Sequence, residues 1–257
     1  MPATLLRSST RTGNATADRA IEILLLFDEQ RLSLSAEDIS RRLKTHRSTA
    51  YRYLQSLLGY GLLEEDVAGA YRLGPRVLQL ARLFRRGVGL SELALPTMYD
   101  LADRTTETVL LTRLFDEQVV CLERVDRGDQ VIRIVYERGQ ILPVTVHMGA
   151  SARVLLAYLP PERQRAILSG VAGLRLSATL RELSAIRAAG HAVAGPDPET
   201  HVRGVAAPVF DADGSVRAAL GVVAPSFRIP DEVLSTYVDL VVQAAAAISD
   251  QLAALDR

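Results

Sequence analysis

Basic and hydroxyl-bearing side chains gather between residues 41 and 52, and they are well suited to contact a nucleic acid. Guanidinium and ammonium groups bind phosphates, and arginine and hydroxyl groups also hydrogen-bond the base edges in the major groove. Helical spacing places several of them on one face. The candidate contacts are Arg41, Arg42, Lys44, Arg47, Ser48, Thr49, Tyr51 and Arg52. A polar helix face can also be plain solvated surface, so the flanking elements must support the interpretation.

Three predicted helices position this cluster. The first follows Asp18 and has a broad apolar face that extends to Phe27. Ser35 begins the second, because Asp38 three residues later completes a pattern that resembles a capping box, with Asp in the place of Glu. Thr45 is placed to cap the third helix, which carries most of the cluster.

A hairpin is predicted after the third helix. Gly59 and Gly61 end that helix, a strand begins at Leu62, and the segment Asp66–Gly69 has the composition of a turn. Arg72 lies on the returning strand, where it can reach a phosphate or the minor groove. Helices, turn and hairpin in this order predict a winged helix-turn-helix, a geometry that places one helix in the major groove of DNA.

Another helix is predicted after the hairpin, because Gly74-Pro75 puts proline at an early helical position. It extends to Gly87 through several leucines. We expect this helix to join two domains and to pack against a second subunit.

Length and charge favour two domains with different partners. The chain has 257 residues and a formal net charge of +0. Residues 1–90 carry 14 Arg and Lys against 9 Asp and Glu, whereas the remainder carries 16 against 21. A basic half joined to an acidic half indicates that only the first half meets a polyanion, although chance variation of surface charge would give the same counts.

Signatures of catalysis and of a membrane span are lacking. Cys121 is the single cysteine, and its strand-like surroundings favour a buried side chain over a nucleophile. The histidines form no HExxH motif, although His147 and His201 could meet a ligand or a metal, and there is no GxSxG, phosphate-loop or GxGxxG motif. No uninterrupted apolar run approaches the roughly 20 residues of a membrane span. We therefore expect no enzyme, no cofactor and no membrane partner.

Residues 1–16 contain no acid and are rich in Ser, Thr and Arg. This composition occurs in transit peptides and also in disordered basic arms ahead of DNA-binding domains. We expect the arm, and with it a cytoplasmic protein.

From about residue 91 the chain alternates between helices and strands rich in Val, Ile and Leu. Asp211–Gly214 is a strong hairpin signal. This order predicts an antiparallel sheet with helices on its faces. The expected strands are 108–113, 118–125, 131–136, 202–210 and 216–224, and the expected helices are 92–104, 150–158, 161–168, 180–189 and 231 to about 255.

The loop at 147–151 is the candidate ligand site of the second half. Its small residues would leave space beside the sheet, and amides at the start of the following helix attract an anion. The same residues could also do no more than begin a helix.

Segments spread along the chain resemble the IclR family of bacterial transcriptional regulators, namely RAIEILLLF, STAYRYLQSL, YRLGPRVLQLARL, LPTMYDLADRTTETVLL, HMGASARVLLAYLP and VAAPVFDADGSVRAALGV. The resemblance spans roughly residues 18–252 and depends on the order and spacing of these segments. It implies a GAF- or PAS-like sensing domain that binds a small carboxylate or aromatic acid. By position, the implied effector-binding residues are Gly149, Ala150 and Ser151 in the loop, Tyr136 and Val144 on an apolar wall, and Val202 and Gly204 on the far side.

The chain departs from the family pattern at several positions. Lys44-Thr45 replaces the usual Gly-Leu of the helix-turn-helix turn, and Ala152-Arg153 replaces a Gly-Lys. His201 stands where a glycine is expected, and Gly204 where a cysteine is frequent. Asp197 and Glu199 are what remains of an acidic pair. Most of these changes concern the ligand domain, so they bear on which effector binds there.

Together these patterns predict an α+β protein with a disordered basic arm at 1–16, a winged helix-turn-helix at 17–74, a linker helix at 75–90 and an effector-binding and oligomerisation domain at 91–257. We expect a repressor that binds a double-stranded DNA operator as a homodimer or a dimer of dimers, because one recognition helix reads too few base pairs. A small-molecule effector would control its affinity. Two alternatives stay open: a ligand-binding module whose winged helix contacts proteins, and an enzyme with a fused regulatory domain.

Overall fold

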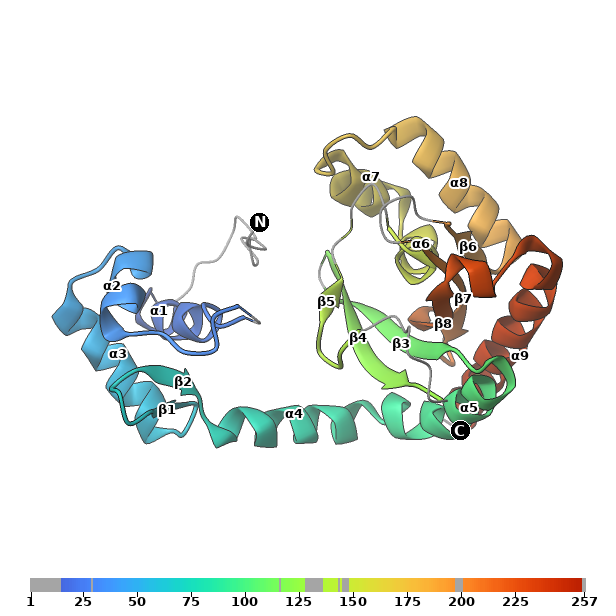
Figure 1. Cartoon of the computed structure of the whole chain (residues 1–257). Helices are drawn as coiled ribbons and strands as arrows, with labels where there is room; N and C mark the ends of the chain where they lie inside the picture. Colours follow the sequence, from blue (N-terminus) through green and yellow to red (C-terminus); the bar gives the residue numbers. More distant parts are fainter. Residues whose placement is uncertain are drawn as a thin grey trace. The chain divides into compact units, whose positions relative to one another are not determined.

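The computed structural model describes residues 15–28, 30–115, 117–127, 136–142, 144, 148–196 and 201–255. The chain forms two compact units, Met1–Gly87 and Val88–Arg257. The first contains helices and a two-stranded sheet, and the second contains a six-stranded sheet with helices on both faces (Figure 1). The basic arm predicted at 1–16 lies outside the described residues except for its last two, which belong to the first helix.

The first unit begins with helices α1 (Ala15–Leu24), α2 (Ala36–Leu43) and α3 (Arg47–Gly59). Asp18 lies inside the first turn of α1, so the helix begins earlier than predicted, and an acid there suits the positive end of the helix. The capping box at Ser35 is confirmed. The Ser35 hydroxyl accepts a hydrogen bond from the Asp38 N–H at 3.1 Å and donates one to the Asp38 carboxylate at 2.7 Å.

The turn between α2 and α3 differs from the prediction. The N-cap of α3 is His46, without a side-chain hydrogen bond, so Thr45 is not the cap. The Thr45 carbonyl instead accepts a hydrogen bond from the Ser40 hydroxyl at 2.8 Å. Lys44 ends α2 in the left-handed conformation with φ of 52°, a conformation that glycine adopts without strain. The glycine that the family usually has at position 44 is therefore explained by the left-handed backbone conformation required there.

The predicted wing consists of β1 (Leu63–Glu65) and β2 (Tyr71–Leu73), an antiparallel pair. Tyr71 is buried and exchanges two backbone hydrogen bonds with Leu34, of 2.9 and 2.8 Å, which ties the wing to the segment ahead of α2. At the end of the wing, the Gly74 N–H donates a hydrogen bond to the Leu62 carbonyl oxygen at 2.9 Å. Glycine is required there, because a Cβ atom would collide with the Gly61 carbonyl oxygen. The next helix, α4, spans Pro75–Val88.

The second unit is built on a sheet in which all neighbouring strands are antiparallel, as predicted. The strand order is β5-β4-β3-β8-β7-β6. The short outer strands were not predicted, and the strand expected at 131–136 lies, apart from its last residue, outside the described residues. The strands are β3 (Thr108–Phe115), β4 (Gln118–Val125), β5 (Ile141–Leu142), β6 (Ala192–Ala194), β7 (Val202–Phe210) and β8 (Val216–Pro225).

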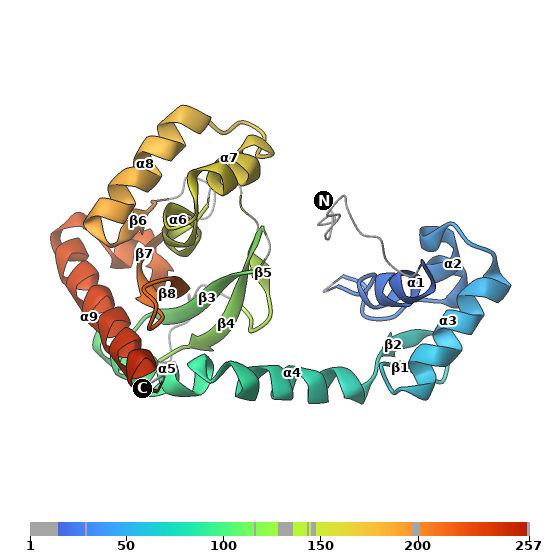
Figure 2. The same cartoon turned by 180° about the vertical axis from the view of Figure 1, so that it is seen from behind.

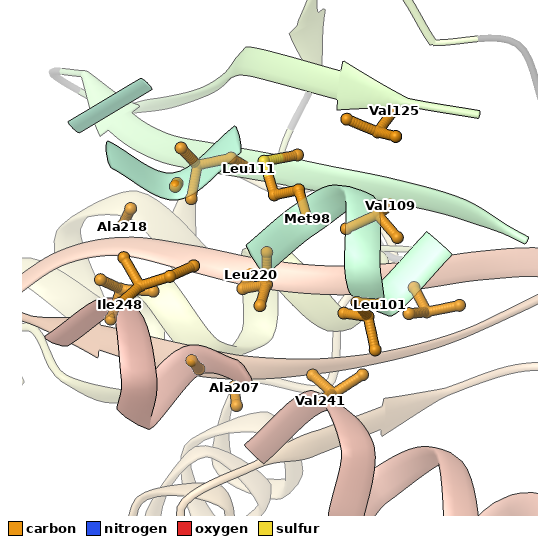
Figure 3. Packing of buried hydrophobic residues seen from close by; sticks show 14 of the residues in the cluster. Met98, Leu101, Val109, Leu111, Val125, Ala207, Ala218, Leu220, Val241 and Ile248 are labelled. Atoms are coloured by element: carbon orange, nitrogen blue, oxygen red, sulfur yellow. The ribbon is translucent and has the colours of Figure 1, made fainter. Parts of the chain in front are cut away.

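Helices cover both faces of this sheet because its strands are apolar on both sides. Helices α5 (Leu90–Thr105) and α9 (Asp231–Leu255) pack on one face, and α6 (Ala150–Ala157), α7 (Pro161–Ser169) and α8 (Leu176–Ala189) lie over the other (Figures 1 and 2). Figure 3 shows the first core, where Leu111 and Leu220 of the sheet meet Met98 and Ile248 of the helices. The second core places Val154 of α6 with Ala206 and Ala219 of the sheet.

Helix α9 is long and apolar enough to cross a membrane by length and composition, although polar residues interrupt its apolar sequence. In the structure one side of α9 packs against the sheet. Its buried residues in the first core are Val241, Ala245, Ile248 and Leu252. Only 22% of its most apolar window is buried, so packing inside this unit accounts for part of its apolar character.

Candidate nucleic-acid interface and ligand site

The polar face of α3 is exposed along its length. Arg47, Ser48, Tyr51 and Arg52 are exposed and Thr49 is half-buried. On the opposite side Ala50, Leu54 and Leu57 are buried, so packing holds the helix with its polar face outward. The helix can therefore present five side chains of the predicted set to a groove.

Arg47 and Tyr51 contact each other on this face. The Arg47 Cζ atom lies 5.7 Å from the centre of the Tyr51 ring, and Arg47 Nη2 lies 3.5 Å from the tyrosine hydroxyl. The hydrogen bond that Arg47 donates to this hydroxyl raises the pKa of Arg47 above its usual range. The pair is thus charged and oriented without a ligand.

The end of α2 adds positive charge beside α3. Arg42 and Lys44 are exposed, whereas Arg41 pairs with Glu37 at 3.1 Å and with Asp38 at 3.2 Å. Arg41 is exposed as well, so these pairs are screened by water and a phosphate can replace them. Arg42 and Lys44 have no ion pair within the described part of the chain.

Arg72 lies on the wing, as predicted, with its side chain exposed. Its Nε atom is 2.7 Å from Glu64 on the neighbouring strand. The wing turn is held by Asp66, whose carboxylate accepts hydrogen bonds from the Ala68 and Ala70 N–H groups at 2.9 and 3.0 Å. These bonds lower the pKa of Asp66. The wing turn is therefore held in place by hydrogen bonds, and Arg72 lies in the middle of the second wing strand.

The candidate ligand loop lies where α6 begins. Gly149 is its N-cap, and Ala150 and Ser151 are buried. A Cβ atom at Gly204 would lie 3.9 Å from Ala150 Cβ, and one at Gly221 would lie 3.0 Å from Ser151 Oγ. The small residues thus bring α6 close to β7 and β8. The expectation that they leave open space is wrong for Ala150 and Ser151, which are packed against the sheet.

The other effector-binding residues implied by the resemblance differ in their burial and in their contacts. Val144 packs against the core that contains Ala150, and Val202 is half-buried in β7 opposite Pro225. Tyr136 is half-buried, and its carbonyl oxygen accepts a hydrogen bond from Arg124 Nη1 at 2.6 Å. His147, Asp197 and Glu199 lie outside the described residues. His201 is exposed with φ of 53°, which explains the glycine expected there.

Arg124 was not singled out from the sequence. Strand pairing places it opposite Leu110, which in turn lies opposite Gly221, so its side chain is on the sheet face that carries α6. The side chain is 16% exposed and pairs with Asp126 at 2.5 Å. The adjacent charges Glu123 and Arg124 at the end of a largely apolar strand were the available signal.

A cavity of about 210 Å³ opens beside Met148, which directly precedes Gly149. Arg153 lines it, donates a hydrogen bond from Nε to the Met148 carbonyl oxygen at 3.0 Å, and pairs with Glu182 of α8. The ligand loop is therefore joined to α8 through the half-buried Arg153.

Cys121 is buried in β4, as predicted. Burial raises the pKa of its thiol to about 11, which keeps it protonated at neutral pH and unsuited to nucleophilic attack. Among the described residues no group of three or more His, Cys, Asp and Glu side chains could hold a metal ion.

Comparisons with known proteins agree over nearly the whole chain. Residues 16–67 match the IclR helix-turn-helix domain, and residues 86–250 match the domain described as bacterial transcriptional regulator IclR C-terminal. The HTH-type transcriptional regulator XynR of Escherichia coli is 30% identical over 247 residues, which cover 92% of this chain and 96% of that protein.

Solved structures agree as well. A putative IclR transcriptional regulator from a Silicibacter species has a TM-score of 0.80 at 28% identity, covering 93% of this chain and 96% of the other. An IclR homolog from Microbacterium hydrocarbonoxydans, complexed with 4-hydroxybenzoate, has a TM-score of 0.79 at 30% identity, covering 93% and 100%. The chain therefore belongs to the IclR family of bacterial transcriptional regulators, and it is a DNA-binding regulator of transcription.

Proposed function

We propose that this regulator is a repressor that occupies a symmetric operator through α3 and changes its affinity when a small carboxylate or aromatic acid binds the second unit. The exposed polar face of α3, backed by a buried apolar face, is the observation that carries the proposal. The complex of an IclR homolog with 4-hydroxybenzoate supports the choice of ligand class.

The candidate DNA-binding side chains would contact two kinds of group, the base edges and the phosphates. Ser48, Thr49, Tyr51 and Arg52 would contact base edges, because they extend from the part of α3 that enters the groove. Arg41, Arg42, Lys44 and Arg47 would bind phosphates around the start of that helix, and Arg72 would bind a phosphate or the minor groove. Phosphate contacts set position, and the base contacts provide specificity.

A homodimer is supported by α4. Its exposed apolar side chains are 50% or more accessible: Leu78 71%, Leu80 51%, Leu83 50% and Phe84 56%. Leu80, Leu83 and Phe84 have helical spacing and form one apolar stripe, which a second copy would bury. Two α3 helices would then read two half-sites, and two such dimers could pair.

The effector would bind near the start of α6, within reach of Gly149, Ala150, Ser151, Tyr136, Val144, Val202 and Gly204. Amides at the N-terminus of α6 favour a carboxylate. Because Ala150 and Ser151 are packed against the sheet, binding there requires the helix to move, and such a movement is a means of signalling to the first unit. The site would bind the effector without converting it chemically. The protein would be cytoplasmic.

Fluorescence anisotropy with fragments of neighbouring promoters tests this function. Arg52→Ala should weaken operator binding roughly ten- to a hundredfold, since a good base contact contributes about 1–3 kcal/mol. Arg19→Ala, which removes an exposed arginine of α1, should leave binding unchanged. Affinity should fall steeply with salt.

The same anisotropy measurement is then repeated with 4-hydroxybenzoate and other small acids added. A change in operator affinity of roughly 5- to 150-fold would demonstrate coupling. Duplex binding that ignores both salt and Arg52→Ala would contradict operator recognition and favour a winged helix that contacts proteins.

A further inference from the structure

The wing differs in charge from the helices beside it. Its two strands and their turn carry three carboxylates, Glu64, Glu65 and Asp66, against one cation, Arg72. Residues 41–52, at the end of α2 and along α3, instead carry five Arg and Lys and no Asp or Glu. A surface that approaches DNA phosphates gains affinity from cations and loses it from carboxylates. The charge of the wing therefore opposes the contact with DNA that α3 favours.

Strand pairing places one of these carboxylates against the cation. Glu64 lies directly opposite Arg72 in the hairpin, and Glu64 Oε1 is 2.7 Å from Arg72 Nε. Leu63 and Tyr71 alternate with this pair along the strands and are buried in the core of the first unit. Alternation therefore puts Glu64 and Arg72 on the solvent face of the wing, where the cation is already bound to a carboxylate of the same hairpin.

A phosphate would compete with Glu64 for Arg72. Carboxylate and phosphate oxygens accept hydrogen bonds from the same guanidinium N–H groups. The side chain of Arg72 is 57% exposed and that of Glu64 is 42% exposed, so water screens the pair and a phosphate can reach the arginine. The exchange has two costs: the ion pair is lost, and the freed Glu64 carboxylate then lies beside the phosphate.

The backbone of the wing is fixed on both sides of this pair. In the turn, the Asp66 carboxylate holds the N–H groups of Ala68 and Ala70. On the returning strand, Tyr71 exchanges backbone hydrogen bonds with Leu34. Release of Arg72 from Glu64 therefore requires rotation of side chains and no rearrangement of the hairpin.

We propose that Glu64 is a positioning residue that holds Arg72 in the place of a phosphate and thereby limits binding to DNA of arbitrary sequence. On such DNA the affinity comes from phosphate contacts, and no base contact compensates the loss of the ion pair. Restraint of this binding leaves the choice of site to the base contacts of α3. The inference rests on the proposed function in one respect, namely that the wing meets DNA together with α3.

Fluorescence anisotropy of the full chain with a duplex of arbitrary sequence, titrated with salt, tests the proposal. Glu64→Gln should tighten binding roughly two- to fivefold, since an exposed ion pair contributes about that factor. The salt slope should steepen by about one, because Arg72 gains a phosphate. A purely structural role of Glu64 would leave the slope unchanged.

Glu65→Gln is the matched control. It removes the same charge from the neighbouring residue, which lies opposite Tyr71 and so on the other face of the hairpin from Arg72. Its gain in affinity should be smaller than that of Glu64→Gln, with the salt slope of the parent. Thermal melting of each variant checks that the first unit is folded.

Glu64→Gln in an Arg72→Gln background completes a double-mutant cycle. The gain there should shrink to that of Glu65→Gln, because no cation remains to be released. The proposal is overturned if Glu64→Gln binds the duplex no more tightly than the parent, if Glu65→Gln gains as much, or if the gain persists without Arg72. Failure of operator recognition is distinguishable, because it would appear as promoter fragments bound no better than the arbitrary duplex.

Discussion

The guanidinium group of Arg47 lies over the ring of Tyr51 one turn further along α3, with 5.7 Å between Cζ and the ring centre. Both side chains belong to the exposed face, so the contact fixes their orientation before a ligand arrives. Ordering two long side chains in advance reduces the entropy lost on binding.

Tyr51→Ala should weaken operator affinity roughly tenfold or more, because it removes a base contact and releases Arg47. Tyr51→Phe keeps the ring under Arg47 and removes only the hydroxyl, so its loss should be smaller. Anisotropy at fixed salt measures both. Tyr60→Ala, an exposed tyrosine just past α3, is the control. Parent-like binding by Tyr51→Ala would remove Tyr51 from the interface.

Lys44→Gly should raise the free energy of unfolding by about 1 kcal/mol, because a non-glycine residue pays roughly 1–2 kcal/mol in the left-handed conformation. It should also weaken operator binding and reduce the salt slope by about one, since a phosphate contact is lost. Lys44→Ala removes the same charge and keeps the strain. Urea unfolding and salt titration of both variants separate the two effects, and equal stability of the two would refute the strain.

Gly74→Ala should destabilise the first unit by about 1–3 kcal/mol, because the new methyl group would press on the Gly61 carbonyl oxygen and force the wing apart. Gly59→Ala is the matched control. Nothing lies within 4 Å of a Cβ atom there, so its effect should be neutral or stabilising by up to about 1 kcal/mol. Thermal melting compares them.

Leu83→Glu should lower the molar mass seen by light scattering after size exclusion, because a carboxylate in the α4 stripe opposes its burial against a second copy. Arg82→Glu places the same side chain on the opposite side of the helix from Leu80 and Phe84, and it should leave the mass unchanged. An unchanged mass in Leu83→Glu would show that α4 is not the dimer contact.

Cys121 should resist thiol reagents in the native protein at pH 8 and react once the chain unfolds. Its pKa is raised from 9.0 to about 11 by burial, so the unfolded thiol ionises first. This contribution to stability is complete below pH 9 and is lost as the pH rises toward 11. A colorimetric thiol assay with and without urea checks the reactivity, and rapid native labelling would contradict the burial.

Much of the fold could be predicted from local patterns. The strand Gln118–Val125 and the start of α9 at Asp231 follow from apolar spacing and an acidic first turn. β6 could not be predicted in this way, since alanines have weak strand propensity and Ala192 pairs only because Ala206 lies opposite. Thr45 was a reasonable cap by residue type, but the chain leaves α2 through the left-handed Lys44, and the N-cap of α3 is His46.

The order of residues along the chain was enough to identify the family and the outward face of α3, because both depend on side chains a few positions apart. The tertiary structure alone decided that Ala150 packs on Gly204 and that Arg124 shares a sheet face with α6. These relations depend on which strands pair and in which register, and such non-local choices are set by burial of the whole core, which no short segment encodes.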